Sequence, residues 1–204
     1  MTRRALPSSP AVPKLWPQGT IVCLGSGPSL TRADVDFCRG KARVIAVNDA
    51  YRLAPFADVL YACDAKFWRW HKGVPNFAGL KYTLDRSVGY PDVVVLQNTG
   101  QTGLELNPTG LRTGYTSGYQ ALNLAVHLGA SRIVLLGYDF QGDHFFGSHP
   151  DQTKPPFQVC LKQFPTLVAP LAAAGVTVIN ATRTTALTTF PRVPLEDVFA
   201  EVAA

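Results

Sequence analysis

A glycine-rich stretch near the N-terminus, Gly25-Ser-Gly-Pro-Ser-Leu30, has the residue types of a phosphate-binding loop. It follows the apolar run Ile21–Leu24, whose unbroken hydrophobicity is typical of a buried parallel strand. Glycines permit a tight turn, and Pro28 suits the first position of a helix because it lacks an N–H group. We therefore expect the loop to present free backbone amides at a helix N-terminus, where phosphate binds readily.

The loop differs from two common nucleotide-binding motifs. Leu30 stands where the dinucleotide fingerprint has its third glycine, and no Lys-Ser or Lys-Thr pair follows, as a P-loop requires. A plain Gly-Pro turn between a core strand and a helix is an open alternative. The loop alone does not distinguish a phosphate site from a structural turn, so the other motifs of the chain are needed.

A second helix start carries small and hydroxyl residues. Thr116, Ser117 and Gly118 are good N-cap residues, and a broad apolar face extends from there to a stop at Gly129. We expect this start and the one near Pro28 to converge on one phosphate-sized pocket.

Two histidines stand in a polar loop after the apolar run Arg132–Gly137. Loops beyond central strands often carry function, and histidine titrates near neutral pH. Because Pro150 restricts the backbone of the residue before it, we expect His149 to do chemistry, with His144 in reserve. The other two histidines lie in an aromatic cluster and near a helix end, where structural roles are expected.

Polar residues also end two further apolar runs. Asn48 and Asp49 follow the run 43–47, and Asp64 follows the run 58–63. In a parallel sheet, ligands bind beyond the carboxyl ends of the strands, so we expect these residues at the rim of a site. Carboxylates there, together with Asp139 and Asp143, could hold a metal ion that bridges phosphates.

Alternation of strand-like and helix-like segments predicts an α/β fold, a single Rossmann-like domain whose mostly parallel sheet is flanked by helices. Its central, adjacent strands are expected to be Ile21–Leu24, Val44–Val47 and Ile133–Leu136. Further strands are predicted near 58–63, 81–84, 92–97 and 176–180, with helices near 31–38, 157–174 and 194–202.

The N-terminal segment differs from the rest. Residues 1–18 contain four prolines and show no apolar periodicity, so we expect a flexible, Pro-rich basic tail before a nucleotide-binding domain at 19–204. Arg3, Arg4 and Lys14 supply more than half of the net charge of +5, so the charge gives no specific sign of nucleic-acid binding.

Composition sets further limits. The chain of 204 residues is 47% hydrophobic and 16% charged, as in an ordinary globular protein. No apolar run has the length of a membrane span and no secretory leader is evident, so a cytoplasmic location is expected. The four cysteines lack metal-site spacing and are expected to be reduced core residues.

Three motifs in order carry a resemblance to known families. They are G-S-G-P-S-L at 25–30, T-S-G-Y-Q-A at 116–121 and L-L-G-Y-D-F at 135–140. Over about residues 21–180 the chain resembles the bacterial sialyltransferases that modify lipooligosaccharides. It is also similar to the 6-hydroxymethylpterin pyrophosphokinase-like family, and to short phage or prophage members of this superfamily.

The resemblance implies that the Gly-Pro-Ser loop and the T-S-G turn hold the cytidine monophosphate (CMP) of a nucleotide-sugar donor. It also implies a general base at His149 or His144. The departures from the family pattern at Ser26 and Gln141 leave the donor and the acceptor unassigned. With the rim residues added, the predicted nucleotide-binding set is Gly25, Ser26, Gly27, Pro28, Ser29, Asn48, Asp64, Thr116, Ser117, Gly118 and Asp139.

Three functions are compatible with these residues. The favoured one is a glycosyltransferase with a CMP-sugar-type donor, which needs no metal or other cofactor because amides and hydroxyls stabilise the departing phosphate. The second is a Mg²⁺-dependent pyrophosphokinase-like transferase, which needs rim carboxylates. The third is a non-catalytic nucleotide-binding accessory protein.

Overall fold

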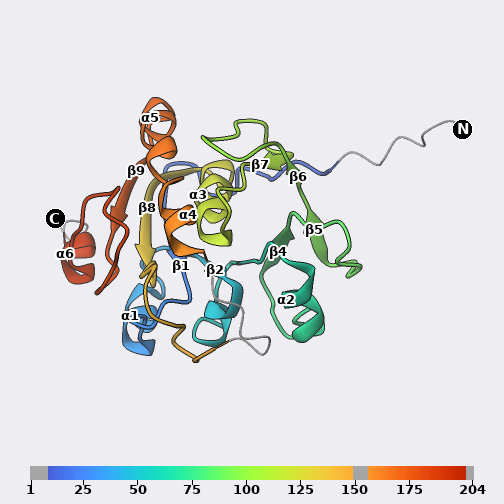
Figure 1. The fold of residues 1–204 in the computed structure, drawn as a ribbon, viewed down its shortest axis with the longest axis horizontal. Coiled ribbons are helices and arrows are strands. Elements are labelled where there is room, and N and C mark those ends of the chain that lie inside the picture. Colours follow the sequence, from blue (N-terminus) through green and yellow to red (C-terminus); the bar gives the residue numbers. More distant parts are fainter. Residues whose placement is uncertain (1–8, 149–155, 201–204) are drawn as a thin grey trace, which may run out of the picture.

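Seven parallel strands form the central sheet of the computed structural model, which describes residues 9–148 and 156–200 (Figure 1). In spatial order these strands are β5 (Val93–Val95), β4 (Leu80–Thr83), β3 (Val59–Tyr61), β2 (Arg43–Val47), β1 (Gly19–Leu24), β8 (Ala130–Leu136) and β9 (Thr177–Asn180). The predicted α/β fold is confirmed, and β2, β1 and β8 are adjacent as expected.

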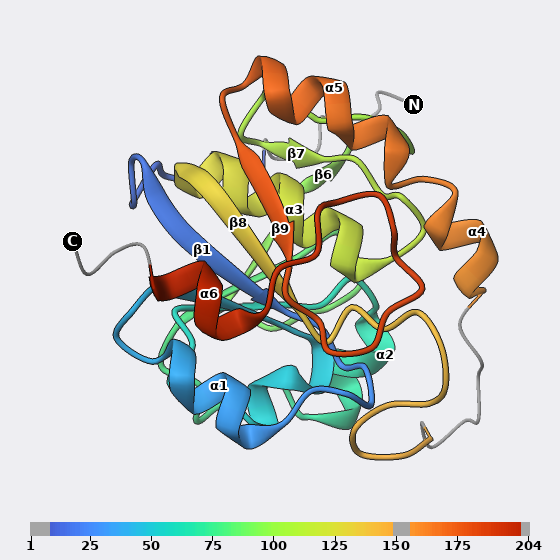
Figure 2. The ribbon, with the colours of Figure 1, turned by 90° about the vertical axis from the view of Figure 1, so that its left-hand side faces the viewer.

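Helices pack on both faces of this sheet (Figure 2). One face is covered by α3 (Ser117–Leu128) and α5 (Pro165–Ala173). The other face is covered by α1 (Arg32–Cys38), α2 (Ala65–Trp70), α6 (Leu195–Ala200) and the 3₁₀ helix η1 (Asn48–Arg52).

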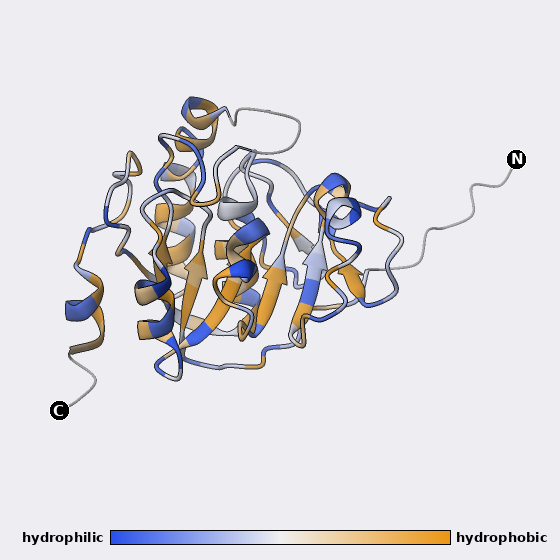
Figure 3. Cartoon of the chain, turned by 90° about the horizontal axis from the view of Figure 1, so that it is seen from below, coloured by the Kyte–Doolittle hydropathy of each residue, from blue (hydrophilic) through white to orange (hydrophobic). Residues whose placement is uncertain are grey.

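Each face of the sheet has its own apolar core, because successive side chains of a strand point to opposite faces. In β1, Ile21 and Cys23 join the core under α3, whereas Val22 and Leu24 join the core under α1 and α2. The strands are mainly hydrophobic and the helices carry hydrophilic segments (Figure 3). No helix among the described residues is both long and apolar enough to cross a membrane.

The strand order reverses beside β1. From β1 the chain adds β2, β3, β4 and β5 in one direction, and then returns through α3 to place β8 on the other side of β1. The carboxyl ends of β1 and β8 therefore flank a switch point, which is where open α/β sheets bind their ligands.

The first helix lies in the predicted segment 31–38 and does not begin at Pro28. Residues 25–30 form an irregular loop, and α1 begins only at Arg32, with Thr31 as its N-cap. The Thr31 hydroxyl accepts a hydrogen bond from the Asp34 amide, and the Asp34 carboxylate accepts one from the Thr31 amide. This capping box fixes the helix start after the Gly-Pro-Ser loop, so Pro28 does not occupy a first helical turn.

Two other predicted elements are broken. The helix expected at 157–174 is divided into α4 (Phe157–Leu161) and α5, because Pro165 cannot continue the first helix and starts the second. The strand expected at 92–97 ends at Val95. Beyond it, β6 (Gln97–Asn98) pairs with β7 (Gly110–Leu111) in a separate small sheet.

The segment before β1 also differs from the flexible tail that the sequence predicts. Val12 is buried, and its amide donates to the Pro108 carbonyl. The Trp16 amide donates to the Leu128 carbonyl at the end of α3. From Val12 onward, this segment therefore packs against the domain.

Candidate functional site

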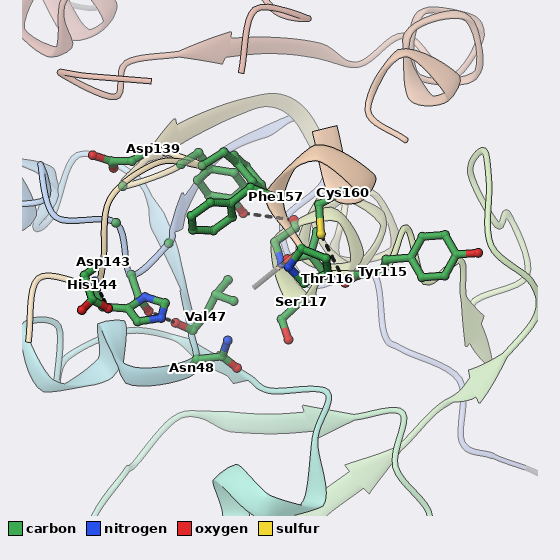
Figure 4. Close-up of a pocket in the computed structure, with 18 of the residues that line it drawn as sticks. Val47, Asn48, Tyr115, Thr116, Ser117, Asp139, Asp143, His144, Phe157 and Cys160 are labelled. Carbon is green, nitrogen blue, oxygen red and sulfur yellow. Dashed lines mark hydrogen bonds between the residues drawn. The ribbon is translucent and has the colours of Figure 1, made fainter. Parts of the chain in front are cut away.

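A pocket of about 290 Å³ lies at the carboxyl ends of β8, β1, β2 and β3 (Figure 4). Its walls come from the loops that follow these four strands, from the first turn of α3, and from α2 and α4. The three spacings of about 4.8 Å between these four strands give the pocket a lateral reach that suits a nucleotide.

The N-terminus of α3 points into this pocket. The Thr116 hydroxyl caps the helix by accepting from the Gly118 amide, and the Ser117 hydroxyl accepts from the Cys63 amide at 3.3 Å. The Ser117 amide has no hydrogen-bond partner within the described part of the chain. The positive end of the helix dipole and this amide together favour an anion.

The Gly-Pro-Ser loop reaches the same pocket, but most of its amides are already bonded. Gly25 donates to Leu136 O at 2.7 Å and Gly27 donates to Gly137 O at 2.9 Å, so the expectation of a row of free amides is wrong. Within residues 9–148 and 156–200, Ser26 is the one member of this loop whose N–H has no partner. Ser26 is therefore the residue of this loop whose amide is available to a ligand.

Close packing explains why glycines stand in this loop. A Cβ atom on Gly27 would overlap the Asp139 carboxylate and lie 2.7 Å from Gly137 O. A Cβ atom on Gly25 would likewise collide with the Gly137 carbonyl. The glycines thus let the loop after β1 pack directly on the loop after β8.

Asp139 supports this packing. Its side chain is directed away from the centre of the pocket in Figure 4, and its Oδ2 accepts from the Ser29 amide at 2.9 Å. Burial raises the pKa of Asp139, and the hydrogen bonds from Ser29 oppose this rise. Pro28 and Ser29 do not line the pocket. Ser29 and Asp139 thus hold the loop in shape. Asp139 also lines the pocket, so the ligand contact predicted for it stays a prediction.

Three residues that line the pocket have left-handed backbone conformations. Asn48 has a φ of 51°, Tyr115 of 60° and Phe140 of 50°. Such conformations are uncommon outside glycine and are concentrated at functional sites. Asparagine tolerates the left-handed conformation better than most residues, so the sequence offers a signal at Asn48. It offers none that would predict this conformation at Tyr115 or Phe140.

His144 forms one wall of the pocket. In Figure 4 its ring lies opposite Thr116 and Ser117, with Asn48 between them and below. The loop that carries it is tied to the Gly-Pro-Ser loop, since the Phe145 amide donates to Ser26 O at 3.1 Å. His149 lies outside the described residues, so its predicted role stays a prediction.

The carboxylates predicted as alternative metal ligands are dispersed. Asp64, Asp139 and Asp143 line the pocket, whereas Asp49 is buried beside Arg52 and His71, with its Oδ1 at 3.6 and 3.3 Å from their side-chain nitrogens. In the described ranges, no three His, Cys, Asp or Glu side chains are grouped to hold a metal ion.

The sequence left several lining residues unassigned. Lys66 and Trp70 come from α2, and Phe157 and Cys160 from α4. The aromatic cluster at 67–71 is visible in the sequence, but nothing in the sequence placed α4 against the T-S-G turn. Among the described lining residues, Lys66 is the one lysine or arginine.

His127 and His71 are held by other parts of the protein. His127 is buried and bonds through Nε2 to the Gly110 carbonyl at 2.9 Å, and burial lowers its pKa. His71 bonds through Nδ1 to the Tyr51 hydroxyl at 2.9 Å. Neither histidine lines the pocket.

Comparison with known proteins bears on the fold. Neither a scan of protein families nor a search of curated proteins gives a match. Among solved structures, the chain is similar to the MAf glycosyltransferase from Magnetospirillum magneticum AMB-1, with a TM-score of 0.63 and 14% identity. The match covers 93% of this chain and 35% of that one.

A second similar structure is the sialyltransferase CstII from Campylobacter jejuni, in complex with a substrate analogue, cytidine-5'-monophosphate. Here the TM-score is 0.55 at 12% identity, over 87% of this chain and 85% of that one. The present chain thus spans about a third of the first structure and most of the second. It has a glycosyltransferase-like fold of the kind that the sialyltransferase CstII also has.

Proposed function

We propose that this protein binds a nucleotide sugar of the CMP type in the switch-point pocket and transfers its glycosyl group to an acceptor. The observation that carries the proposal is the convergence of the α3 N-terminus and the Ser26 loop beside β1 and β8. Support comes from the shared fold, since one similar structure is a sialyltransferase in complex with CMP.

The site has the groups that such a reaction uses. The amides of Ser26 and Ser117, together with the dipole of α3, stabilise the phosphate that departs when the glycosidic bond breaks. Hydroxyls of the first α3 turn add hydrogen bonds. We propose that this set serves without a metal ion, because Asp49 lies outside the pocket beside Arg52 and His71, and one oxygen of Asp139 is held by the Ser29 amide.

The acceptor needs a base to remove its proton. His144 lines the pocket opposite the α3 turn, and its imidazole is suited to proton transfer near neutral pH. Among the described histidines we propose His144 for this role, and His149 stays the candidate that the sequence favours.

A thermal-shift screen of nucleotides tests the binding step, because a ligand of the folded state raises the melting temperature. We expect CMP to raise it in EDTA, with no further rise on adding Mg²⁺. A shift by ATP that needs Mg²⁺ would instead support the pyrophosphokinase-like function. CMP binding without turnover of any CMP-sugar would support the accessory protein.

A further inference from the structure

The ring of His144 is packed against a neighbouring aromatic side chain. Its imidazole stacks on the Phe146 ring, with 5.0 Å between ring centroids and 4° between the ring planes. Parallel stacking of this kind favours one common plane for the two rings. It therefore limits the directions in which the imidazole nitrogens can point.

Phe146 also contacts a cation. The Arg52 guanidinium carbon lies 5.4 Å from the centroid of the Phe146 ring, within the range in which a cation is attracted to an aromatic face. Arg52 is the last residue of η1, the 3₁₀ helix that begins at Asn48 on the floor of the pocket. The contact thus links the loop after β8 to the element after β2.

Arg52 is itself held in place. Its Nη1 lies 3.6 Å from Oδ1 of Asp49, a carboxylate that is only 3% exposed. The same oxygen lies 3.3 Å from Nε2 of His71, which places a second partner on Asp49 from α2. A buried charge with two partners is a firm anchor, because removing either partner leaves it less compensated.

The loop that carries His144 is anchored to the domain at Phe145. Gly142 and Gly147 both have positive φ, and residues 141–143 and 147–148 are exposed. Among the described residues, one backbone hydrogen bond, from Phe145 to Ser26, joins the loop to the domain, and Phe145 packs on the core. This anchoring sets where the loop lies, and the Phe146 ring that stacks on the imidazole bears on how the imidazole is turned.

We propose that Phe146 and Arg52 are positioning residues, which hold the imidazole of His144 in the orientation that faces the pocket. The inference rests on the proposed function, in which His144 accepts the proton of the acceptor. Neither residue touches the substrate, so their loss changes the rate of the chemical step and spares donor binding.

Kinetics of four variants measure this effect. Phe146→Leu removes the aromatic face, and Arg52→Met removes the cation but keeps a long side chain. We expect kcat to fall about tenfold to a hundredfold in Phe146→Leu, as for a misplaced catalytic group, with KM for the donor within about twofold. Phe146→Tyr keeps the aromatic ring, so its kcat should stay close to the wild-type value. Arg52→Lys keeps the positive charge, so it should lower kcat less than Arg52→Met does.

The chain offers a matched control on α1. Arg39 lies over the Phe56 ring at 4.1 Å and pairs with Asp36 at 3.7 Å, the same spacing in sequence as Arg52 and Asp49. None of these three residues lines the pocket. Arg39→Met and Phe56→Leu should therefore leave kcat unchanged.

Proton NMR of the histidine rings tests the stacking without any need for turnover. The His144 resonance is assigned by its loss in His144→Gln, and the Phe146 ring current should displace it. We expect Phe146→Leu to abolish this displacement and Phe56→Leu to leave it. An unmoved resonance would overturn the proposal, as would a normal kcat in Phe146→Leu when His144→Gln is impaired. If the wild-type protein has no turnover, the proposed function fails, and the NMR result alone decides whether Phe146 orients His144.

Discussion

Asp139 is a buried carboxyl group that joins the loop after β8 to the loop after β1. Its Oδ2 accepts from the Ser29 amide, whereas its Oδ1 has no hydrogen-bond partner among the described residues. Because burial raises its pKa, the folded state holds this proton more tightly than the unfolded chain does. Its contribution to stability is therefore largest in acid and declines as the pH rises through the unfolded pKa toward the folded one.

Asp139→Asn should consequently raise the melting temperature at pH 7. Asparagine keeps an oxygen that accepts from Ser29 and removes the charge that burial disfavours. For a chain of this size, each kcal/mol gained corresponds to about 2–4 °C. Thermal unfolding at pH 7 and pH 4 measures the effect, and the gain should shrink at pH 4. A lower melting temperature at pH 7 would show that the carboxylate has a stabilising partner.

The two histidines of the loop after β8 can be separated by substitution. Under the proposed function, replacing the general base by alanine should reduce turnover by roughly two to four orders of magnitude, with little change in CMP affinity. Steady-state kinetics of His144→Ala and His149→Ala, beside calorimetry with CMP, measure both quantities. We expect the large loss in His144→Ala. Equal, small losses in both variants would mean that water takes the proton.

At the scale of single residues, the sequence predicted where chemistry could occur better than which atom does it. The polar rim was visible because Asn48 and Asp64 follow apolar runs and Ser117 stands at a helix start. The sequence could not show that Ser29 and Asp139 are hydrogen-bonded to each other, since 110 positions separate them and only the pairing of β1 with β8 brings them together.

Among the elements, the Gly-Pro-Ser loop is the one whose role changes most. Its sequence suggests glycines that make room for phosphate. Instead, these glycines make room for the chain after β8, since a Cβ atom on Gly27 would overlap Asp139 and approach Gly137 O. A larger side chain at Gly27 should therefore disturb the fold itself.

Gly27→Ala should destabilise the protein. Overpacking of one methyl group against backbone costs about 1–3 kcal/mol, and here the neighbouring carbonyl belongs to a central strand end. Urea unfolding of wild type and variant measures the free energy of unfolding directly. Unchanged stability together with lost CMP binding would contradict this account. It would mean that Gly27 makes room for the ligand and not for the chain after β8.

The ends of helices could be predicted where a local capping signal sets them. The ends of strands that are set by tertiary pairing could not. The Thr31 capping box and the Gly129 stop of α3 are local signals, and both operate in the structure. The end of β5 at Val95 has no such signal, because the chain turns there to pair with residues near Gly110.

For the whole molecule, strand order is the property that makes the site. An alternation of strands and helices implies a parallel sheet, but the reversal at β1 is set by where β8 inserts, and no local pattern encodes that insertion. Once β8 lies beside β1, the T-S-G turn of α3 and the Gly-Pro-Ser loop necessarily meet. This is how segments about 90 residues apart, which the sequence predicted to converge, line one pocket.

A charge placed at the α3 N-cap tests the central claim that this pocket binds the phosphate of CMP. Thr116→Asp keeps a good N-cap residue, since aspartate caps at least as well as threonine, and it puts a negative charge at the proposed phosphate position. Thr116→Asn is the matched control, with the same cap and no charge. Calorimetry in EDTA should show similar CMP affinity for wild type and Thr116→Asn, and at least about tenfold weaker binding for Thr116→Asp. Equal affinity in all three proteins, or no CMP binding by the wild type without Mg²⁺, would contradict the account.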